Sequence, residues 1–470
     1  MNVFKFSSSL PYLSVLGVLT LVSSSLSPVL QAEERISIPD EDLPRNIIYL
    51  IGDGMGPAYT SAYRYFSDRP DTKHVEETIF DQLLVGMSST YPDDDTYVTD
   101  SAAAATALAT SHKSYNGAIS VDHQQDKLPT MMEMAKERGK ATAIVVTSQI
   151  NHATPASFLA HNESRRNYNQ IADSYLTNLI NGRPIADLML GGGTQYFVRE
   201  DKDLTQEFQH FGYQYIDKLS DLSSIDSLPA LGLFAPSGME PALGSHDPYR
   251  LTTMTQTALK LLSKQTAPFV MMVEGSQIDW CGHSNDIVCA MNEMDDFAKT
   301  LIAVKHYVDT HPDTLLVATA DHSTGGLTLG REGKYKWKGK RLKQVKMLPE
   351  DVAKAIVKTP SILDTPKSFS AFWSKTINIS MSAEILDRFR VRLMGRLKSH
   401  EPADRLEELI KQKIDKLTYT GWTTSGHNGI DVQIFAYGKG QQHFNGHLDN
   451  TKIAATLIEM IKAERFRQDQ

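Results

Sequence analysis

A serine and an aspartate stand side by side where a helix can begin. Asp100 and Ser101 precede the alanine-rich run 102–107. The free N–H groups and the positive dipole end of a first helical turn favour an anion. A serine at that place could attack phosphorus and then carry the phosphoryl group. Asp and Ser are also ordinary helix caps, so the pair alone does not decide between capping and catalysis.

Carboxylates and imidazoles recur at positions that could bind metal. Asp279 and His283 are four residues apart, a spacing that brings both side chains to one point on a helical turn or a tight loop. Adjacent Asp321 and His322 could serve one ion as an oxygen and nitrogen pair, and the small neighbours of His427 allow a metal close to the backbone. Mixed donors favour zinc, whereas an all-oxygen set favours magnesium.

The complete set of such groups is Asp53, Glu274, Asp279, His283, Asp321, His322 and His427. Each has a structural alternative, such as a helix cap, a turn residue or a hydrogen-bonded core histidine. Seven such groups in one chain favour a metal centre over seven separate structural roles.

The elements that position these groups are short apolar runs. The runs 46–51, 141–146, 269–273 and 314–319 alternate with helical patterns, among them 131–138, 249–264 and 285–308, and a last strand and helix follow at 432–437 and 450–463. This pattern predicts an α/β fold whose large, mostly parallel central sheet is covered by helices on both faces. Polar groups at the carboxyl ends of such strands form ligand sites.

The stretch 331–420 differs in composition from the rest of the chain. It is rich in Lys and Arg and carries amphipathic helical pieces at 383–397 and 403–417. We expect an inserted, crown-like segment packed on the functional rim of the sheet. A solvated basic face explains its charges at least as well as a role in substrate binding.

The first 32 residues read as a signal peptide. Lys5 precedes the apolar stretch 10–26, and cleavage is expected after Ala32. The apolar stretch is shorter than the ~20 residues of a spanning helix, and no later stretch reaches that length. We therefore expect an exported protein, periplasmic or secreted, with no membrane span after cleavage and a single catalytic domain from residue 33 to 470.

Composition limits the partners and the cross-links. A net charge of −8 without a basic, aromatic-bearing stripe argues against a nucleic-acid-binding module. An anionic substrate would then be attracted by a local positive site. The two cysteines, Cys281 and Cys289, could pair in an oxidising compartment, but the sequence does not decide whether they do.

Several short motifs follow one another along the chain. They are Ile51-Gly52-Asp53-Gly54-Met55-Gly56, Thr99-Asp100-Ser101-Ala102-Ala103, Tyr115-Asn116-Gly117-Ala118, Ala153-Thr154-Pro155-Ala156, Ser164-Arg165, Glu274-Gly275-Ser276-Gln277-Ile278-Asp279, Thr319-Ala320-Asp321-His322 and Gly426-His427. In this order they resemble the motifs of bacterial alkaline phosphatases, and the resemblance extends from residue 46 to 461. The stretch 331–420 resembles only the variable insertion of that family. The resemblance implies a homodimeric hydrolase of broad range that releases phosphate from small phosphate monoesters.

The resemblance also implies a role for each site residue. Ser101 would be the nucleophile, Asp100 would aim it, and Arg165 would clamp two phosphoryl oxygens. One zinc would ionise Ser101, and a second would stabilise the leaving oxygen and supply the hydroxide that hydrolyses the phosphoserine. The implied ligands are Asp53, Asp321 and His322 for the first zinc, Asp279, His283 and His427 for the second, and Asp53, Thr154 and Glu274 for magnesium.

General chemistry agrees with these roles. Two metals about 3.5–4 Å apart can neutralise the attacking and leaving oxygens, and zinc lowers the pKa of bound water to about 7. A planar guanidinium matches two phosphoryl oxygens better than a lysine does.

Two residues behind the implied ligands depart from the enteric branch of the family. His152 replaces an aspartate that supports the magnesium site, so the third site could hold magnesium less tightly or accept zinc. Trp280 replaces a lysine that reaches phosphate through water, so product should bind more weakly.

Other functions remain open at this stage. The same scaffold could serve a phosphodiesterase, a sulfatase or a phosphonate hydrolase. Ser101 lacks the Cys/Ser-x-Pro-x-Arg context of sulfatases, and Arg165 favours a dianionic monoester. An inactive phosphate- or metal-binding protein should lack at least one of these groups, and none is missing.

Overall fold

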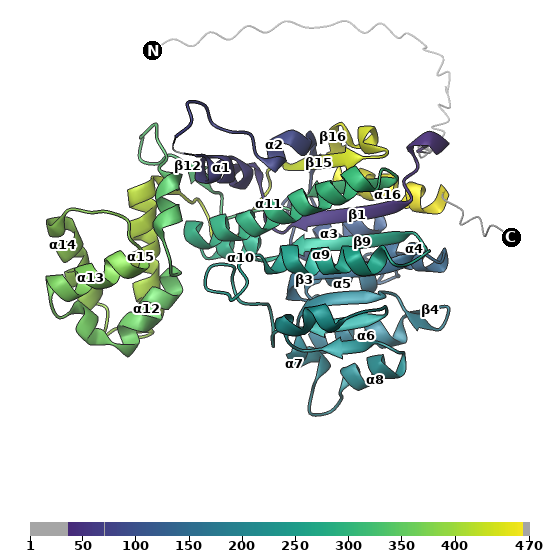
Figure 1. Cartoon of the computed structure of the whole chain (residues 1–470), viewed down its shortest axis with the longest axis horizontal. Coiled ribbons are helices and arrows are strands. Elements are labelled where there is room, and N and C mark those ends of the chain that lie inside the picture. The colour runs from purple at the N-terminus through teal and green to yellow at the C-terminus, as the bar shows by residue number, and fades with distance from the viewer. Residues whose placement is uncertain (1–35, 70, 464–470) are drawn as a thin grey trace, which may run out of the picture. The chain divides into compact units, whose positions relative to one another are not determined.

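A ten-stranded sheet organises the described part of the chain, residues 36–69 and 71–463, in this computed structural model (Figure 1). The strand order is β16-β2-β15-β10-β1-β9-β3-β6-β8-β7, and β15 alone runs antiparallel to its neighbours. The strands are β1 (Asn46–Gly52), β2 (Leu84–Ser89), β3 (Ala141–Gln149), β6 (Leu188–Gly192), β7 (Gln214–Ile216), β8 (Ala230–Leu233), β9 (Phe269–Gly275), β10 (Thr314–Thr319), β15 (Val432–Gly438) and β16 (Gly446–Asp449). The predicted signal peptide lies outside the described residues.

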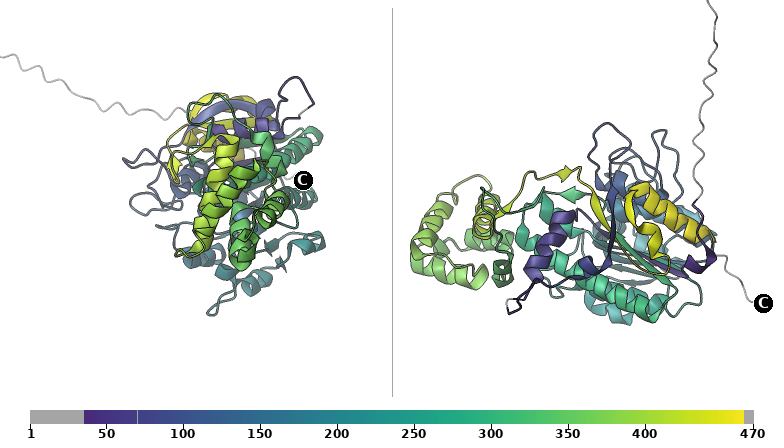
Figure 2. Two further views of the ribbon diagram at one scale, coloured as in Figure 1. Left: turned by 90° about the vertical axis from the view of Figure 1, so that its left-hand side faces the viewer. Right: turned by 90° about the horizontal axis from the view of Figure 1, so that it is seen from above.

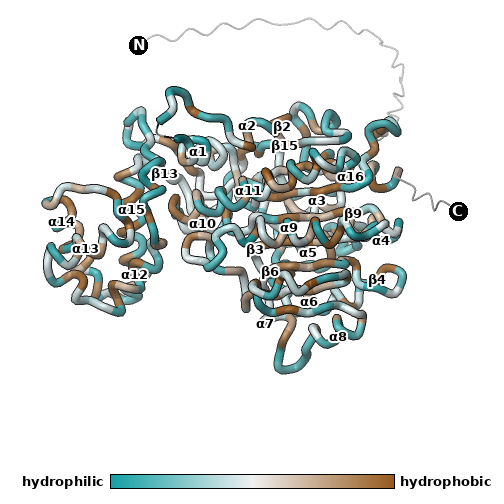
Figure 3. The backbone as a smooth tube through the Cα atoms, in the orientation of Figure 1, coloured by the Kyte–Doolittle hydropathy of each residue, from teal (hydrophilic) through white to brown (hydrophobic). Residues whose placement is uncertain are grey.

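Both faces of the sheet are buried, because alternate strand residues point into two separate cores. In β1, Ile48 and Leu50 join one core, whereas Ile47 and Tyr49 join the other. The central strands accordingly appear in the hydrophobic colours of Figure 3. This arrangement confirms the predicted α/β class.

Helices complete the two cores from opposite sides of the sheet (Figure 2). The first core includes α1 (Pro57–Ser67), α2 (Ile79–Leu83), α9 (Arg250–Leu262), α10 (Gln277–His283) and α11 (Ile287–Thr310). The second includes α3 (Ser101–Thr110), α4 (Met131–Glu137), α5 (Ala153–Leu159), α6 (Tyr168–Thr177), α7 (Thr194–Phe197), α8 (Leu204–His210) and α16 (Asn450–Ala463). The short strands β4 (Leu179–Ile180) and β5 (Arg183–Pro184) pair with each other.

Four helices fill most of the stretch 331–420: α12 (Pro349–Lys358), α13 (Pro366–Thr376), α14 (Ala383–Met394) and α15 (Pro402–Thr418). They group beside the sheet in Figure 1 and bury Phe369, Trp373 and Ile410 among themselves. The stretch lies between β12 (Thr328–Leu329) and β13 (Thr420–Gly421), which pair with each other. Lys343 donates to the carbonyl of Ser67 and so ties the stretch to the end of α1.

Cys281 and Cys289 form a disulfide that joins α10 to α11, with their Cα atoms 5.4 Å apart. The sequence had left this pairing open. None of the helices in the described residues combines the length and the apolar character needed to cross a membrane.

Candidate metal centre

The carboxyl ends of three adjacent parallel strands bring buried carboxylates together. Asp53 directly follows β1, Glu274 lies at the end of β9, and Asp321 is two residues beyond β10. All three are fully buried. Because β10, β1 and β9 are neighbours in the sheet, the predicted convergence of strand ends occurs here.

The first group joins Ser101 to Asp53, Asp321 and His322. His322 Nε2 lies 3.2 Å from Asp321 Oδ2 and 3.5 Å from Asp53 Oδ1. Ser101 Oγ lies 3.1 Å from the same nitrogen. Ser101 is the first residue of α3, and Asp100 caps that helix by accepting from the N–H of Ala103. The structure therefore combines the two readings of the pair: Asp100 caps, and Ser101 faces the cluster.

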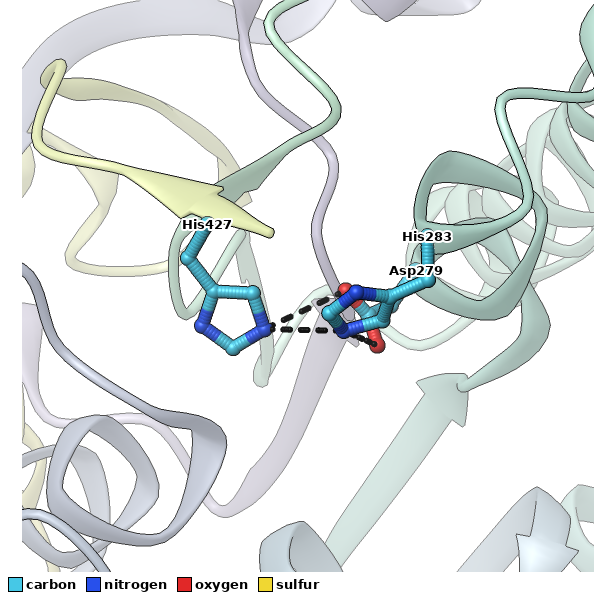
Figure 4. A group of neighbouring side chains, drawn as sticks. All are labelled: Asp279, His283 and His427. Atoms are coloured by element: carbon cyan, nitrogen blue, oxygen red, sulfur yellow. Dashed lines mark hydrogen bonds and ion pairs between the residues drawn. The ribbon is translucent and has the colours of Figure 1, made fainter. Parts of the chain in front are cut away.

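The second group consists of Asp279, His283 and His427, whose side chains point toward one another in Figure 4. Asp279 and His283 lie one turn apart on α10, so the spacing argument is confirmed. Asp279 Oδ2 is 3.3 Å from His283 Nε2, and Asp279 Oδ1 is 3.6 Å from His427 Nε2. The two Nε2 atoms are 3.1 Å apart.

A two-stranded ladder brings the two groups side by side. β11 (Ser323–Thr324) pairs antiparallel with β14 (His427–Asn428), which places His427 opposite Thr324. The rings of His322 and His427 consequently stack with centroids 3.6 Å apart. Seven protein groups thus meet in one place, although they come from distant parts of the sequence.

Backbone and hydroxyl oxygens orient the imidazoles. Nδ1 of His283 is 2.6 Å from the carbonyl oxygen of Ser425, and Nδ1 of His427 is 2.8 Å from that of Thr99. An Nδ1–H that donates to a carbonyl leaves the lone pair of Nε2 facing the cluster, as a metal ligand requires. The hydroxyl of Thr324 orients His322 in the same way, since its Oγ1 lies 3.2 Å from His322 Nδ1. The same hydroxyl donates to Asp279.

A third group contains Asp53, His152 and Glu274. Buried Thr154, on α5, lies beside Glu274. Glu274 Oε2 accepts from Ser276 and Ser148, yet its Oε1 has no hydrogen-bond partner among the described residues. Both carboxylate oxygens of Asp53 and Oδ2 of Asp321 are also buried without a hydrogen-bond partner among the described residues.

Unpaired buried carboxylates are costly unless a cation neutralises them. Burial, together with the charge of neighbouring carboxylates, raises the pKa of Asp321 to about 8, that of Glu274 to about 7 and that of Asp53 well above its ordinary range. Burial also lowers the pKa of His152 to about 3 and keeps its imidazole neutral. Orphaned oxygens, the neutral imidazole of His152 and inward-facing Nε2 atoms therefore fit bound metal ions.

Arg165 borders this centre. Its Nη1 lies 2.9 Å from Asp100 Oδ2, and its Nη2 lies 3.4 Å from His152 Nε2. Trp280 packs edge-on against His152, with ring centroids 5.9 Å apart. All residues that the sequence singled out are therefore in or beside one site.

Sequence reasoning missed the hydroxyl residues that support the ligands. Thr324 follows His322 by two residues, and Ser276 follows Glu274 by two. A hydroxyl two positions after a strand-end ligand was the available signal, but Ser and Thr are too common in loops for that signal to stand alone.

Comparison with known proteins gives the same picture. The family model for alkaline phosphatase matches residues 44–463. Alkaline phosphatase 3 of Bacillus subtilis is 43% identical over 453 residues, which cover 96% of each chain. The crystal structure of a cold-active alkaline phosphatase from a psychrophilic Shewanella species is similar with a TM-score of 0.82 and 46% identity, over 88% of this chain and 99% of that one.

A second solved structure, the alkaline phosphatase of the Antarctic bacterium TAB5, has a TM-score of 0.66 and 26% identity over 90% of this chain and 98% of that one. Mutants of that protein have been solved with Mg bound in the M3 site. The match in sequence and in structure spans the sheet and the residues of the metal centre. The chain therefore belongs to the alkaline phosphatase family and is a hydrolase of phosphate monoesters.

Proposed function

We propose that this protein is an exported, broad-range phosphomonoesterase that works through a phosphoserine at Ser101. The observation that carries the proposal is the position of Ser101 Oγ, 3.1 Å from His322 Nε2 within the buried cluster of carboxylates and imidazoles. The Ser101 hydroxyl reaches this cluster from the first turn of α3. The N-terminus of a helix favours an anion at that place.

The residues divide the reaction between them. Ser101 Oγ attacks phosphorus, the substrate's alcohol leaves with its oxygen, and water then hydrolyses the phosphoserine to release phosphate. Arg165 contacts two phosphoryl oxygens, and its guanidinium is held for that task because Nη1 donates to Asp100 Oδ2 at 2.9 Å. Asp100 also fixes the start of α3, so one carboxylate positions both the nucleophile and the guanidinium.

We assign two zinc ions and one magnesium to the centre. Asp53, Asp321 and His322, with Ser101, fit the first zinc; Asp279, His283 and His427 fit the second; and Asp53, Thr154 and Glu274 fit magnesium. When bound, the metals supply positive charge that favours ionised Ser101, steadies the leaving oxygen and lowers the pKa of water. His152 lies within reach of the third group, so that site could also take zinc.

The nucleophile is tested by Ser101→Ala. We expect the rate on p-nitrophenyl phosphate to fall by about a thousandfold or more, as for loss of an activated nucleophile. Metal content measured in the same samples should stay near two zinc and one magnesium per chain. A variant with wild-type turnover would exclude the phosphoserine mechanism.

The substrate class is tested by three chromogenic esters. We expect fast hydrolysis of p-nitrophenyl phosphate, and rates lower by several orders of magnitude on bis-p-nitrophenyl phosphate and p-nitrophenyl sulfate. Arg165 is suited to a dianionic monoester, because the three free oxygens of a monoester share two negative charges, whereas the two free oxygens of a diester share only one. A diester rate that exceeds the monoester rate would favour the phosphodiesterase alternative.

Export and assembly are proposals of the same kind. We propose cleavage near Ala32, a periplasmic or secreted mature protein and a homodimer. Edman sequencing of the mature N-terminus and light scattering of the purified enzyme test these expectations.

A further inference from the structure

The turn at residues 115–118 contacts the residue that precedes the proposed nucleophile. That residue is Asp100, the cap of α3, and its backbone N–H donates to Asn116 Oδ1 at 2.6 Å. In return, the backbone N–H of Gly117 donates to Asp100 Oδ1 at 3.0 Å. The turn therefore binds both the backbone and the carboxylate of the residue next to Ser101.

The same turn also holds the loop that carries Arg165. This loop, residues 160–167, connects α5 to α6 and contains no helix of its own. The backbone N–H of Arg165 donates to the carbonyl oxygen of Gly117 at 2.8 Å, and the hydroxyl of Tyr115 donates to the carbonyl oxygen of Glu163 at 3.0 Å. The backbone position of Arg165 therefore depends on the turn and not on a helix.

These contacts close a ring of hydrogen bonds. Arg165 Nη1 donates to Asp100 Oδ2 at 2.9 Å, so the ring runs from Asp100 through the turn to the backbone of Arg165 and returns through its guanidinium. Asn116 Nδ2 donates in addition to the carbonyl oxygen of Val98 at 3.1 Å. Both ends of the Asn116 amide are thus used on the segment that precedes α3. Because the members of such a network support one another, loss of one contact should loosen the rest.

The two groups that the turn connects differ in what else holds them. All residues of α3 are buried, and Ser101 Oγ lies 3.1 Å from His322 Nε2, so the hydroxyl stays at the metal centre without help from the turn. The guanidinium of Arg165 has the ring and a 3.4 Å contact with His152 Nε2. Loss of the turn's contacts should therefore displace the guanidinium more than the hydroxyl.

We propose that Asn116 is a positioning residue, which fixes the guanidinium of Arg165 relative to Ser101 Oγ so that both meet the same phosphoryl group. Asn116 acts through Asp100 and Gly117 and does not touch the substrate. Displacement of a positioned group by about 1 Å can cost about a hundredfold in rate. The proposal rests on the proposed function, because the contact of Arg165 with phosphoryl oxygens is proposed there.

A double-mutant cycle with N116A and R165A, on the metal-loaded enzyme, tests this role. In the wild-type background, N116A should lower kcat/KM for p-nitrophenyl phosphate about tenfold to a hundredfold and raise the inhibition constant of phosphate about tenfold, at unchanged zinc and magnesium content. In the R165A background, N116A should cost less than about twofold, because no guanidinium remains to be displaced. A merely structural role of Asn116 would cause equal losses in both backgrounds.

The matched control is N292A. Asn292 is partly buried, as Asn116 is, and its Nδ2 donates to the carbonyl oxygen of Val288 at 2.8 Å on α11. Its loss should leave kcat/KM and phosphate inhibition unchanged. A second variant, Y115F, removes the hydroxyl that contacts Glu163 and almost no volume. It should change both quantities in the direction of N116A, by about two- to fivefold and only where Arg165 is present.

Thermal melting shows whether the variants fold, and Y115F decides the matter if N116A does not. Losses that are equal with and without Arg165, or a phosphate inhibition constant that stays at the wild-type value, overturn the positioning role. A different result contradicts the proposed function. If R165A alone binds phosphate and hydrolyses p-nitrophenyl phosphate as the wild type does, Arg165 is no phosphoryl clamp, and the positioning role is wrong together with it.

Discussion

At the scale of single residues, the orientation of three imidazoles decides what the centre can bind. His283 and His427 each direct Nδ1 to a backbone carbonyl, and His322 directs Nδ1 to Thr324. The sequence singled out these imidazoles as candidate ligands because histidines and carboxylates rarely occur together in such a pattern. It could not predict Ser425 and Thr99, because any residue supplies a carbonyl and only the fold selects which.

Thr324→Val tests the orientation of His322 and Asp279. Valine removes the hydroxyl that donates to Asp279 and lies 3.2 Å from His322 Nδ1. Loss of such a supporting contact typically weakens metal binding 10–100-fold, so metal loss to a chelator should accelerate by about that factor. Thr328→Val, at an exposed position of β12, is the control and should leave metal loss unchanged. Equal rates in both variants would show that Thr324 does not position the ligands.

Trp280→Lys tests the weak-product hypothesis. Trp280 packs edge-on against His152 and brings no charge to the phosphate side of the centre. A partly exposed lysine should add roughly 0.5–1 kcal/mol of attraction, so the inhibition constant of phosphate should fall about two- to fivefold. If product release limits turnover, kcat and KM should fall together. Trp280→Phe adds no charge, and phosphate inhibition that is equal in the two variants would refute the hypothesis.

At the scale of elements, most of what the sequence predicted correctly concerns the strands of the parallel sheet. The apolar runs 46–51, 269–273 and 314–319 correspond to β1, β9 and β10, and the site lies at their carboxyl ends. The paired elements β11 and β14 were not predictable, because each spans two residues without a periodic pattern. The antiparallel direction of β15 likewise depends on long-range pairing.

Asp415→Asn tests a buried carboxyl of α15. Burial raises the pKa of Asp415 to about 7 from an ordinary 3.8, and Trp422 Nε1 donates to it at 3.4 Å. The Asp415 carboxyl therefore loses its proton near pH 4 in the unfolded chain but near pH 7 in the folded chain. The stability contributed by this carboxyl is therefore present below about pH 4 and lost as the pH rises through 7.

Asparagine keeps the acceptor for Trp422 and carries no charge. We expect the free energy of unfolding at pH 8 to exceed that of the wild type by about 1–3 kcal/mol, with a smaller difference at pH 5. Urea unfolding at both pH values measures this. Asp364→Asn changes an exposed carboxylate of the same insertion and is the control. A difference that does not grow between pH 5 and pH 8 would contradict the assignment.

At the scale of the whole molecule, charge is divided between regions. The chain is acidic overall, the insertion is basic, and four buried carboxylates converge where the strands end. The sequence revealed the first two properties directly. For the third, the sequence predicted that strand ends converge, but it did not show that Asp53 and Asp321 are neighbours, because they are 268 positions apart in the chain and are adjacent only through the pairing of β1 with β10.

Metal removal should therefore lower stability as well as activity. Without cations, Asp53, Glu274, Asp279 and Asp321 face one another in a buried site, where unneutralised charge is costly. Ions present at about 1,000 times their dissociation constant stabilise the folded state by about 4 kcal/mol per site. Dialysis against EDTA should thus lower the melting temperature by on the order of 10 °C, and zinc with magnesium should restore it. In Ser101→Ala, which keeps all four carboxylates, EDTA should still cause most of this shift although activity is already lost. A melting temperature that does not respond to EDTA, in protein shown by metal analysis to have lost its ions, would mean that the four carboxylates are stable without cations.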